Sequence, residues 1–225
     1  KLKSPDSRVK MKLVHVDRES LVTAVATTVV DASVEECAAL VFSDLGSRKA
    51  RSKTGKGLLV DQTVKQINSH SLYFTLTRSL GVIGLATRDW RSKVIWHKQE
   101  DNKVIFDLSD TMELQENFPV KAGNVLASAH TVWVFEPLVP VGGVPQTSVT
   151  FATKIDLGGI IISSVMNKLV PRFLTAVSDL RKKFDKSKEI DALNRAKVKE
   201  DIENLSSDKI RGLDRGFMEV EGAKK

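Results

Sequence analysis

The chain has 225 residues, of which 41% are hydrophobic, so it can bury a sizeable core and is not disordered throughout. Its formal net charge is +7, and +6 of this falls on the first 185 residues, so the excess of cations belongs to the part that carries the folding signals. Aromatic residues make up only 6% and no zinc-finger spacing accompanies the charge, which argues against nucleic acid and leaves an anionic membrane surface as a partner.

The single cysteine, Cys37, can form no internal disulfide, which suits a reducing compartment. Its apolar neighbours indicate a buried position in a helix rather than a reactive thiol. No apolar run reaches the ~18 residues that a membrane-spanning helix requires. We therefore expect a cytoplasmic protein that associates with membranes peripherally, and we expect no metal and no cofactor, because no motif has metal-ligand spacing. No pattern assigns an oligomeric state.

The first predicted elements are two antiparallel strands and a helix. Residues 9–16 and 21–30 are rich in Val and Thr and are separated by a short polar turn, which is typical of a hairpin. Ser33 and Glu36 have the spacing of a capping box, and apolar residues at helical spacing follow them. This pattern predicts a helix over residues 34–45.

Strand patterns recur through the middle of the chain and are followed by one long helix. The strands follow one another without intervening helices, so the sheet is predicted to be antiparallel, and a sheet of this size with one apolar face must curl. From residue 160 to residue 184 the apolar side chains step by three and four along one side of a helix, and Pro171 within it predicts a kink. The predicted strands are 62–68, 72–78, 86–98, 103–109, 125–136 and 147–156.

Together these elements predict an α+β helix-grip fold, in which a curved antiparallel sheet wraps around a long C-terminal helix and encloses a cavity. The predicted domain covers residues 1–186. Residues 187–225 are charged and weakly patterned, and we expect them to form an extension or linker with one or two short helices.

Short motifs follow one another in a definite order from residue 87 to residue 181. They are Thr87-Arg88-Asp89-Trp90, Val94-Ile95-Trp96, Phe135-Glu136-Pro137-Leu138, Thr147-Ser148-Val149-Thr150-Phe151, Ile155-Asp156-Leu157-Gly158-Gly159, Asn167-Lys168-Leu169 and Asp179-Leu180-Arg181. In order and spacing the chain resembles the steroidogenic-acute-regulatory-related lipid transfer (START) family over residues 9–184. The resemblance implies a lipid tunnel between the sheet and the terminal helix, gated by a loop before the final strand.

The resemblance also bears on the kind of lipid. Sterol-binding relatives carry an arginine paired with an acid in the tunnel, and the corresponding position here falls near Val125, with no arginine between Arg91 and Arg172. A largely apolar ligand is therefore expected, a sterol-like or other weakly polar lipid ahead of a phospholipid, held by one or two hydrogen bonds. The predicted lipid-binding residues are Trp90, Trp96, Asp107, Asp110, Ser128, His130, Trp133, Phe151, Met166, Leu169, Val170, Phe173 and Leu174.

The stretch from residue 137 to residue 146 is predicted to be the gate loop. Its four branched apolar side chains in a Pro/Gly frame cannot all fold inward, and exposed apolar groups on a loop indicate a binding surface, although a loop packed on its own domain is the alternative. Five cations between Arg48 and Lys56 are expected to add attraction to anionic lipid, with a merely solvated loop as the alternative. The predicted gate and membrane-contact residues are Leu138, Val139, Val141 and Val144.

The function expected from the sequence is the binding of a single hydrophobic lipid and its transfer between membranes, without catalysis. One alternative is a lipid-sensing module of a larger protein. The other is a cyclase- or hydrolase-like enzyme on the same fold, with His130 and Asp107 or Asp110 as an acid/base pair and Ser128 as the nucleophile. No nucleophile elbow frames these residues, so the enzyme is the weaker alternative.

Overall fold

The computed structural model describes residues 2–14, 21, 23–46, 59–159, 161 and 163–204, with the side chains of residues 46 and 163–168 left out. The chain divides into two units: residues 1–140 with 145–185, and residues 141–144 with 186–225. The predicted turn at 17–20 and the basic segment 48–56 lie outside the described residues.

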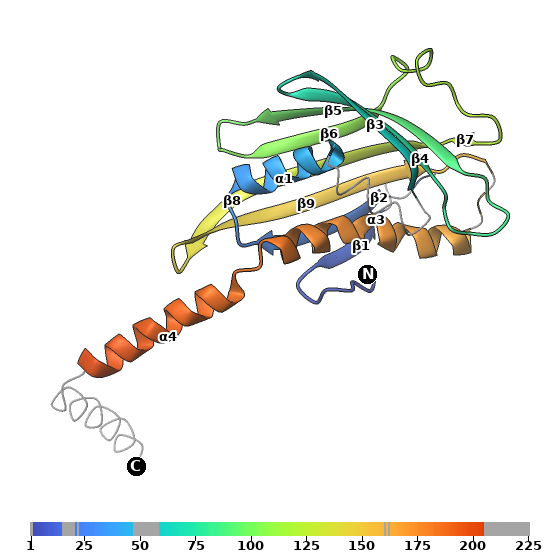
Figure 1. Cartoon of the computed structure of the whole chain (residues 1–225). Helices are drawn as coiled ribbons and strands as arrows, with labels where there is room; N and C mark the ends of the chain where they lie inside the picture. Colours follow the sequence, from blue (N-terminus) through green and yellow to red (C-terminus); the bar gives the residue numbers. More distant parts are fainter. Residues whose placement is uncertain are drawn as a thin grey trace. The chain divides into compact units, whose positions relative to one another are not determined.

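The described strands form one antiparallel sheet, to which a two-residue strand adds a parallel pairing (Figure 1). Most neighbours in the sheet are also neighbours in the sequence, but β6 pairs with β8, and β2 crosses over to pair with β9, which joins the start of the chain to its last strand. The order is β1-β2-β9-β8-β6-β5-β4-β3, with β7 against β5. The strands are β1 (Lys10–Val14), β2 (Thr23–Val30), β3 (Leu59–Asn68), β4 (Ser71–Arg78), β5 (Arg88–Lys98), β6 (Val104–Asp110), β7 (Val125–Leu126), β8 (Ser128–Val141) and β9 (Val144–Asp156).

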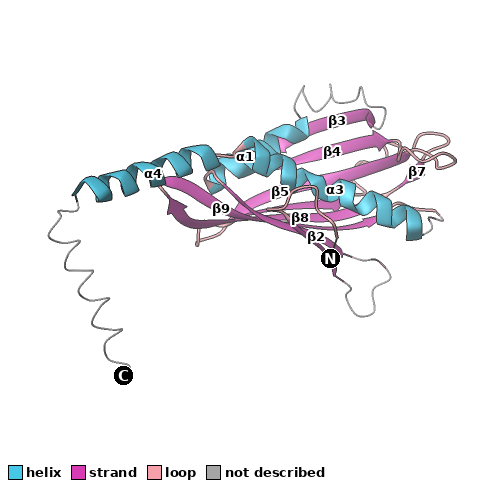
Figure 2. Cartoon of the chain, turned by 90° about the horizontal axis from the view of Figure 1, so that it is seen from below, coloured by secondary structure: helices cyan, strands magenta, loops and turns pink. Residues whose placement is uncertain are grey.

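Two helices of the first unit, α1 (Val34–Gly46) and α3 (Ser163–Lys183), cover the same face of the sheet (Figure 2). The capping box starts α1 as predicted: the Ser33 amide donates to the Glu36 carboxylate at 2.9 Å, and the Glu36 amide donates to the Ser33 hydroxyl at 3.2 Å. The second unit contains α4 (Ser187–Asn204).

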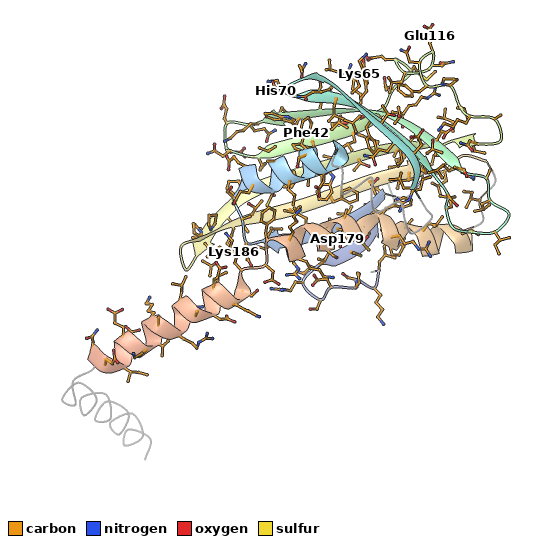
Figure 3. The ribbon with its side chains drawn as sticks, in the orientation of Figure 1. Phe42, Lys65, His70, Glu116, Asp179 and Lys186 are labelled. Atoms are coloured by element: carbon orange, nitrogen blue, oxygen red, sulfur yellow. The ribbon has the colours of Figure 1, made fainter. Side chains whose placement is uncertain are left out.

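Strand alternation selects the side chains that face the helices. We call the helix-covered side the inner face and the opposite side the outer face. Inner-face residues of β6, β8 and β9 pack with α3 in a buried cluster in which Trp133 stacks parallel to Phe135 and meets Phe151 edge-on at 4.6 Å between ring centroids. From α1, Phe42 reaches Phe106 at 5.9 Å (Figure 3). The core of the first unit therefore lies between the inner face and the two helices.

Cys37 belongs to this core, as the sequence predicts. The residue is fully buried, and burial raises the pKa of its thiol to about 12, although a hydrogen bond with Thr147 acts in the opposite direction. The thiol is therefore protonated at neutral pH and behaves as a small apolar group.

The helix-grip prediction is confirmed, including the first hairpin and the long terminal helix, which continues through Pro171. The predicted loop at 137–146 is wrong. Strands β8 and β9 continue through it and are joined by a two-residue turn at Gly142 and Gly143, whose φ values of +58° and +76° suit a tight hairpin. The prolines here suggested a loop, but β8 pairs with β6 only as far as Phe135, and proline is tolerated where one side of a strand lacks a partner.

Candidate functional site

A second apolar cluster lies at one end of the inner face, separate from the main core. Its buried members are Leu80, Trp90, Ala127, Leu157 and Leu169, and we call it the Trp90 cluster. Phe173 of α3 packs against it, whereas Leu174, Val177 and Leu180 of the same helix belong to the main core. The helix therefore spans two apolar regions of one sheet face.

Polar side chains separate these two regions. On β8 and β9, Thr131 and Thr153 are buried and join their hydroxyls at 2.7 Å. Along β8 the inner-face series runs from Trp133 in the main core through Thr131 to Ala129, which packs on the Trp90 cluster. Ser92 of β5 is also buried and lies between Trp90 and Val94 on the same face of the strand. Hydroxyl groups thus stand midway along an otherwise apolar surface, where they can meet a polar group of a bound molecule.

Arg88, at the end of the sheet beside the Trp90 cluster, donates hydrogen bonds to three backbone carbonyls. Its Nε donates to the Leu157 carbonyl at 2.6 Å, Nη2 donates to the Gly158 carbonyl at 3.3 Å, and Nη1 donates to the Ala86 carbonyl. The residue is buried, and burial lowers the pKa of its guanidinium. Its hydrogen bonds in the structure go to neutral carbonyls.

Asp89, the next residue, faces the outer side and fixes the segment 111–124 there. Its carboxylate accepts hydrogen bonds from the Thr77 hydroxyl at 2.7 Å, the Lys121 amide at 2.9 Å and the Asn124 side-chain amide at 2.9 Å. Burial acts to raise the pKa of this carboxyl, but the three donors outweigh it and the pKa is lowered. Arg88 and Asp89 therefore connect β5 by hydrogen bonds to the turn after β9 on one face and to the segment 111–124 on the other.

Most of the predicted aromatic and aliphatic ligand residues lie on the helix-covered side. Trp90, Leu169 and Phe173 are in or against the Trp90 cluster. The others belong to the main core or pack against it: Trp96, Trp133, Phe151, Val170 and Leu174. The side chain of Met166 lies outside the described residues.

The predicted polar ligand residues are placed differently. Asp107 and His130 alternate with inner-face residues on β6 and β8, so they lie on the outer face, where their side chains approach to 3.3 Å and remain exposed. Asp110 ends β6, and its carboxylate accepts from the Ala129 amide at 3.0 Å. Burial raises the pKa of Asp110, while this bond and the Ser128 hydroxyl oppose the shift. Asp107 and His130 are predicted from their chemical type alone, whereas strand alternation places Ser92, Thr131 and Thr153 on the inner face.

The predicted gate residues lie on the hairpin that replaces the expected loop. Leu138, Val139 and Val141 are exposed, and Val144 is buried. A second apolar segment, 79–87 between β4 and β5, was not singled out from the sequence. It buries Leu80 in the Trp90 cluster and exposes Ile83 completely. Its signal in the sequence is an apolar run interrupted by Gly81 and Gly84, both at positive φ.

Comparison with solved structures agrees with this architecture. The lipid transfer and protein localization domain of human StarD13 superposes with a TM-score of 0.63 at 15% identity, covering 82% of this chain and 87% of that one. A STAR-related lipid transfer protein fragment from Xanthomonas axonopodis gives 0.63 at 16%, covering 82% and 97%. Human StAR-related lipid transfer protein 5 gives 0.62 at 17%, covering 82% and 85%.

The chain has the START-like fold. No family model and no curated protein sequence matches it, so the likeness is one of structure. In this START-like domain α3 is the helix held by the curved sheet. No helix of the described residues is long and apolar enough to cross a membrane. The part of the chain that the structure describes also contains no group of three His, Cys, Asp or Glu side chains able to hold a metal ion.

Proposed function

We propose that this START-like domain binds one hydrophobic lipid between the inner face of the sheet and α3 and carries it between membranes. The observation that supports this most is the inner face itself. It presents two apolar regions with buried hydroxyls between them, and one long helix covers both. Covering the acyl or ring body of a lipid there stabilises the complex by ~25 cal/mol per Å² of apolar surface removed from water.

The proposed lipid-contacting residues are Trp90, Trp96, Asp110, Trp133, Phe151, Met166, Leu169, Val170, Phe173 and Leu174. To these we add Ser92, Thr131 and Thr153, which supply hydrogen bonds from the inner face. We leave Asp107, Ser128 and His130 out of the set because the strand alternation turns them to the outer face. Asp110 stays in the set, because its Cα lies opposite that of the inner-face residue Ser92.

We also propose that the domain acts without catalysis. The candidate acid/base pair Asp107 and His130 lies on the outer face, away from the proposed lipid, and Ser128 alternates on β8 with inner-face residues. A general base must come within hydrogen-bond reach of the group it deprotonates, so this pair is poorly placed for chemistry on a lipid bound at the inner face.

Peripheral membrane contact completes the proposal. We propose that the segment 79–87 touches the bilayer, because the same segment exposes Ile83 to solvent and packs Leu80 against the proposed lipid site. The hairpin residues Leu138, Val139 and Val141 remain a second proposed contact.

A transfer assay tests this proposal. The full chain is mixed with donor vesicles of phosphatidylcholine containing a fluorescent lipid and a quencher, and with unlabelled acceptor vesicles. We expect the chain to accelerate dequenching and to be recovered with lipid bound but chemically unchanged, as judged by mass spectrometry. A chain that accelerates no transfer of any lipid, or that releases altered lipid, would contradict the proposal.

A further inference from the structure

Three arginines gather at the end of the inner face beside the Trp90 cluster. Arg78 ends β4 and is the direct register partner of Arg88 on β5, two residues beyond the inner-face pair Leu76 and Trp90. Strand alternation therefore puts both arginines on the inner face. On α3, Arg172 precedes Phe173, whose ring lies 6.0 Å from the guanidinium carbon of Arg78.

The charges of Arg78 and Arg172 are close enough to influence one another. Burial lowers the pKa of Arg78, and the nearby charge of Arg172 lowers it further. Arg88 is buried and bonded to neutral carbonyls. Positive charge is thus concentrated at a partly desolvated place, which is costly unless an anion is bound there.

The surrounding carboxylates are engaged elsewhere. Asp89 faces the outer side and already accepts three hydrogen bonds. Asp156 is exposed and accepts a bond from the Gly158 amide of its own turn. Within the described residues, no ion pair joins a carboxylate to Arg78, Arg88 or Arg172, whereas Arg181, farther along α3, is paired with both Asp6 and Asp185.

The arginines retain donors for an anion. A guanidinium carries five N–H groups, and the three carbonyl bonds of Arg88 leave two of its own free. Arg78 belongs to the sheet and Arg172 to α3, so both elements bring positive charge to the same end of the proposed lipid site. Arginine forks match the oxygen geometry of phosphate, and the Trp90 cluster offers apolar contact next to them.

We propose that Arg78 and Arg172, with Arg88 behind them, bind the phosphate of a glycerophospholipid headgroup while its acyl chains lie on the Trp90 cluster. This proposal rests on the proposed function and names its lipid class. It replaces the sequence-based preference for a sterol-like ligand, which rested on the lack of an arginine between Arg91 and Arg172. The strand register brings Arg78 and Arg88 together, and Arg91, on the other face, donates to the Phe118 carbonyl at 3.4 Å.

The test compares two lipids that differ only in the phosphate. The full chain is incubated with phosphatidylcholine vesicles containing equal amounts of dioleoyl phosphatidic acid, dioleoylglycerol and cholesterol, and the recovered lipid is quantified by mass spectrometry. We expect phosphatidic acid to exceed dioleoylglycerol by about tenfold, because phosphate to arginine bonds are charge-assisted. Arg78→Gln and Arg172→Gln should each lose most of this preference and keep dioleoylglycerol binding, and Arg78→Lys should restore part of it.

Controls keep the outcomes distinct. Lys65 lies on β3 with its Cα opposite Tyr73, on the outer face and exposed, so Lys65→Gln removes the same charge from the far side of the sheet and should change nothing (Figure 3). Arg172 is exposed on the helix, so its variant folds even if Arg78→Gln does not.

Equal uptake of phosphatidic acid and dioleoylglycerol, unchanged by Arg172→Gln, would overturn the arginine site and leave the proposed function intact. Uptake of no lipid at all would instead contradict the proposed function. Calorimetric binding of inorganic phosphate that depends on Arg78, without any phospholipid uptake, would assign the site to free phosphate and overturn the headgroup proposal.

Discussion

At the scale of single residues, Asp89 and its neighbour Arg88 make hydrogen bonds on opposite faces of β5. The side chain is 7% exposed and is held by donors from β4 and from the segment 111–124. Arg88 holds the other face of the same strand end through carbonyls after β9. The two side chains therefore hold together the segments at one end of the proposed lipid site.

Replacing Asp89 with Ala should lower the free energy of unfolding by about 2–3 kcal/mol, because three donors lose a charged acceptor. Chemical denaturation at neutral pH measures this. Thr150→Ala on β9, a residue outside this hydrogen-bond network, is the control and should cost less than about 1 kcal/mol.

The same carboxylate makes a pH prediction with a definite sign. Its pKa is lowered in the folded state, so its stabilisation is present above the unfolded pKa of ~3.9 and is lost as the pH falls through the lower folded value. The stability difference between wild type and Asp89→Asn should therefore shrink on acidification below about pH 4. A difference that grows with acid would contradict the assignment.

At the scale of elements, the turn after β9 is constrained more by space than by backbone angle. Gly158 and Gly159 have similar φ values of +64° and +66°. A Cβ at Gly158 would lie 2.4 Å from the Leu126 carbonyl oxygen and 2.8 Å from a methyl of Val125, whereas nothing lies within 4 Å of a Cβ at Gly159. The turn thus approaches β7 closely at one residue only.

Gly158→Ala should consequently destabilise the domain by about 3 kcal/mol or more, since it adds a backbone clash to the strain of positive φ. Gly159→Ala carries the angle strain alone and should cost about 1 kcal/mol. Thermal unfolding of the pair isolates the clash; equal losses would show that the approach of the turn to β7 is unimportant.

The segment 79–87 makes the prediction about membrane contact. Ile83→Asp should slow lipid transfer between vesicles by about tenfold, because it replaces an inserting apolar group with a charge, and should leave thermal stability unchanged because Ile83 is fully exposed. Val139→Asp on the hairpin is the matched variant, with a side chain 84% exposed. Slowing by Val139→Asp alone would move the contact to the hairpin.

At the scale of the whole molecule, local patterns in the sequence predicted the sheet and the helices well. The capping box at Ser33 and the three-and-four spacing along α3 depend on neighbouring residues, and both predictions are confirmed. The prolines near Gly142 favour a loop in the sequence, although the structure has a hairpin of two strands there.

The candidate site was harder to predict because it depends on pairings between distant strands. The meeting of Arg78 with Arg88, and of Thr131 with Thr153, follows from register, which one sequence does not specify. Asp107 and His130 were selected by chemical type although alternation turns them outward. The aromatic and aliphatic candidates whose side chains the structure describes lie on the helix-covered side, because their burial follows from composition and period.

The central claim is that one lipid lies between the inner face and α3. Crosslinking measures this most directly: the full chain is loaded from vesicles with a phospholipid that carries a photoreactive group in one acyl chain, irradiated, and analysed by mass spectrometry. We predict one lipid per chain, attached at Trp90 or Trp133 of the inner face or at Phe173 of α3. Absence of a crosslinked lipid, or attachment confined to outer-face positions such as Lys65 and His130, would contradict the account.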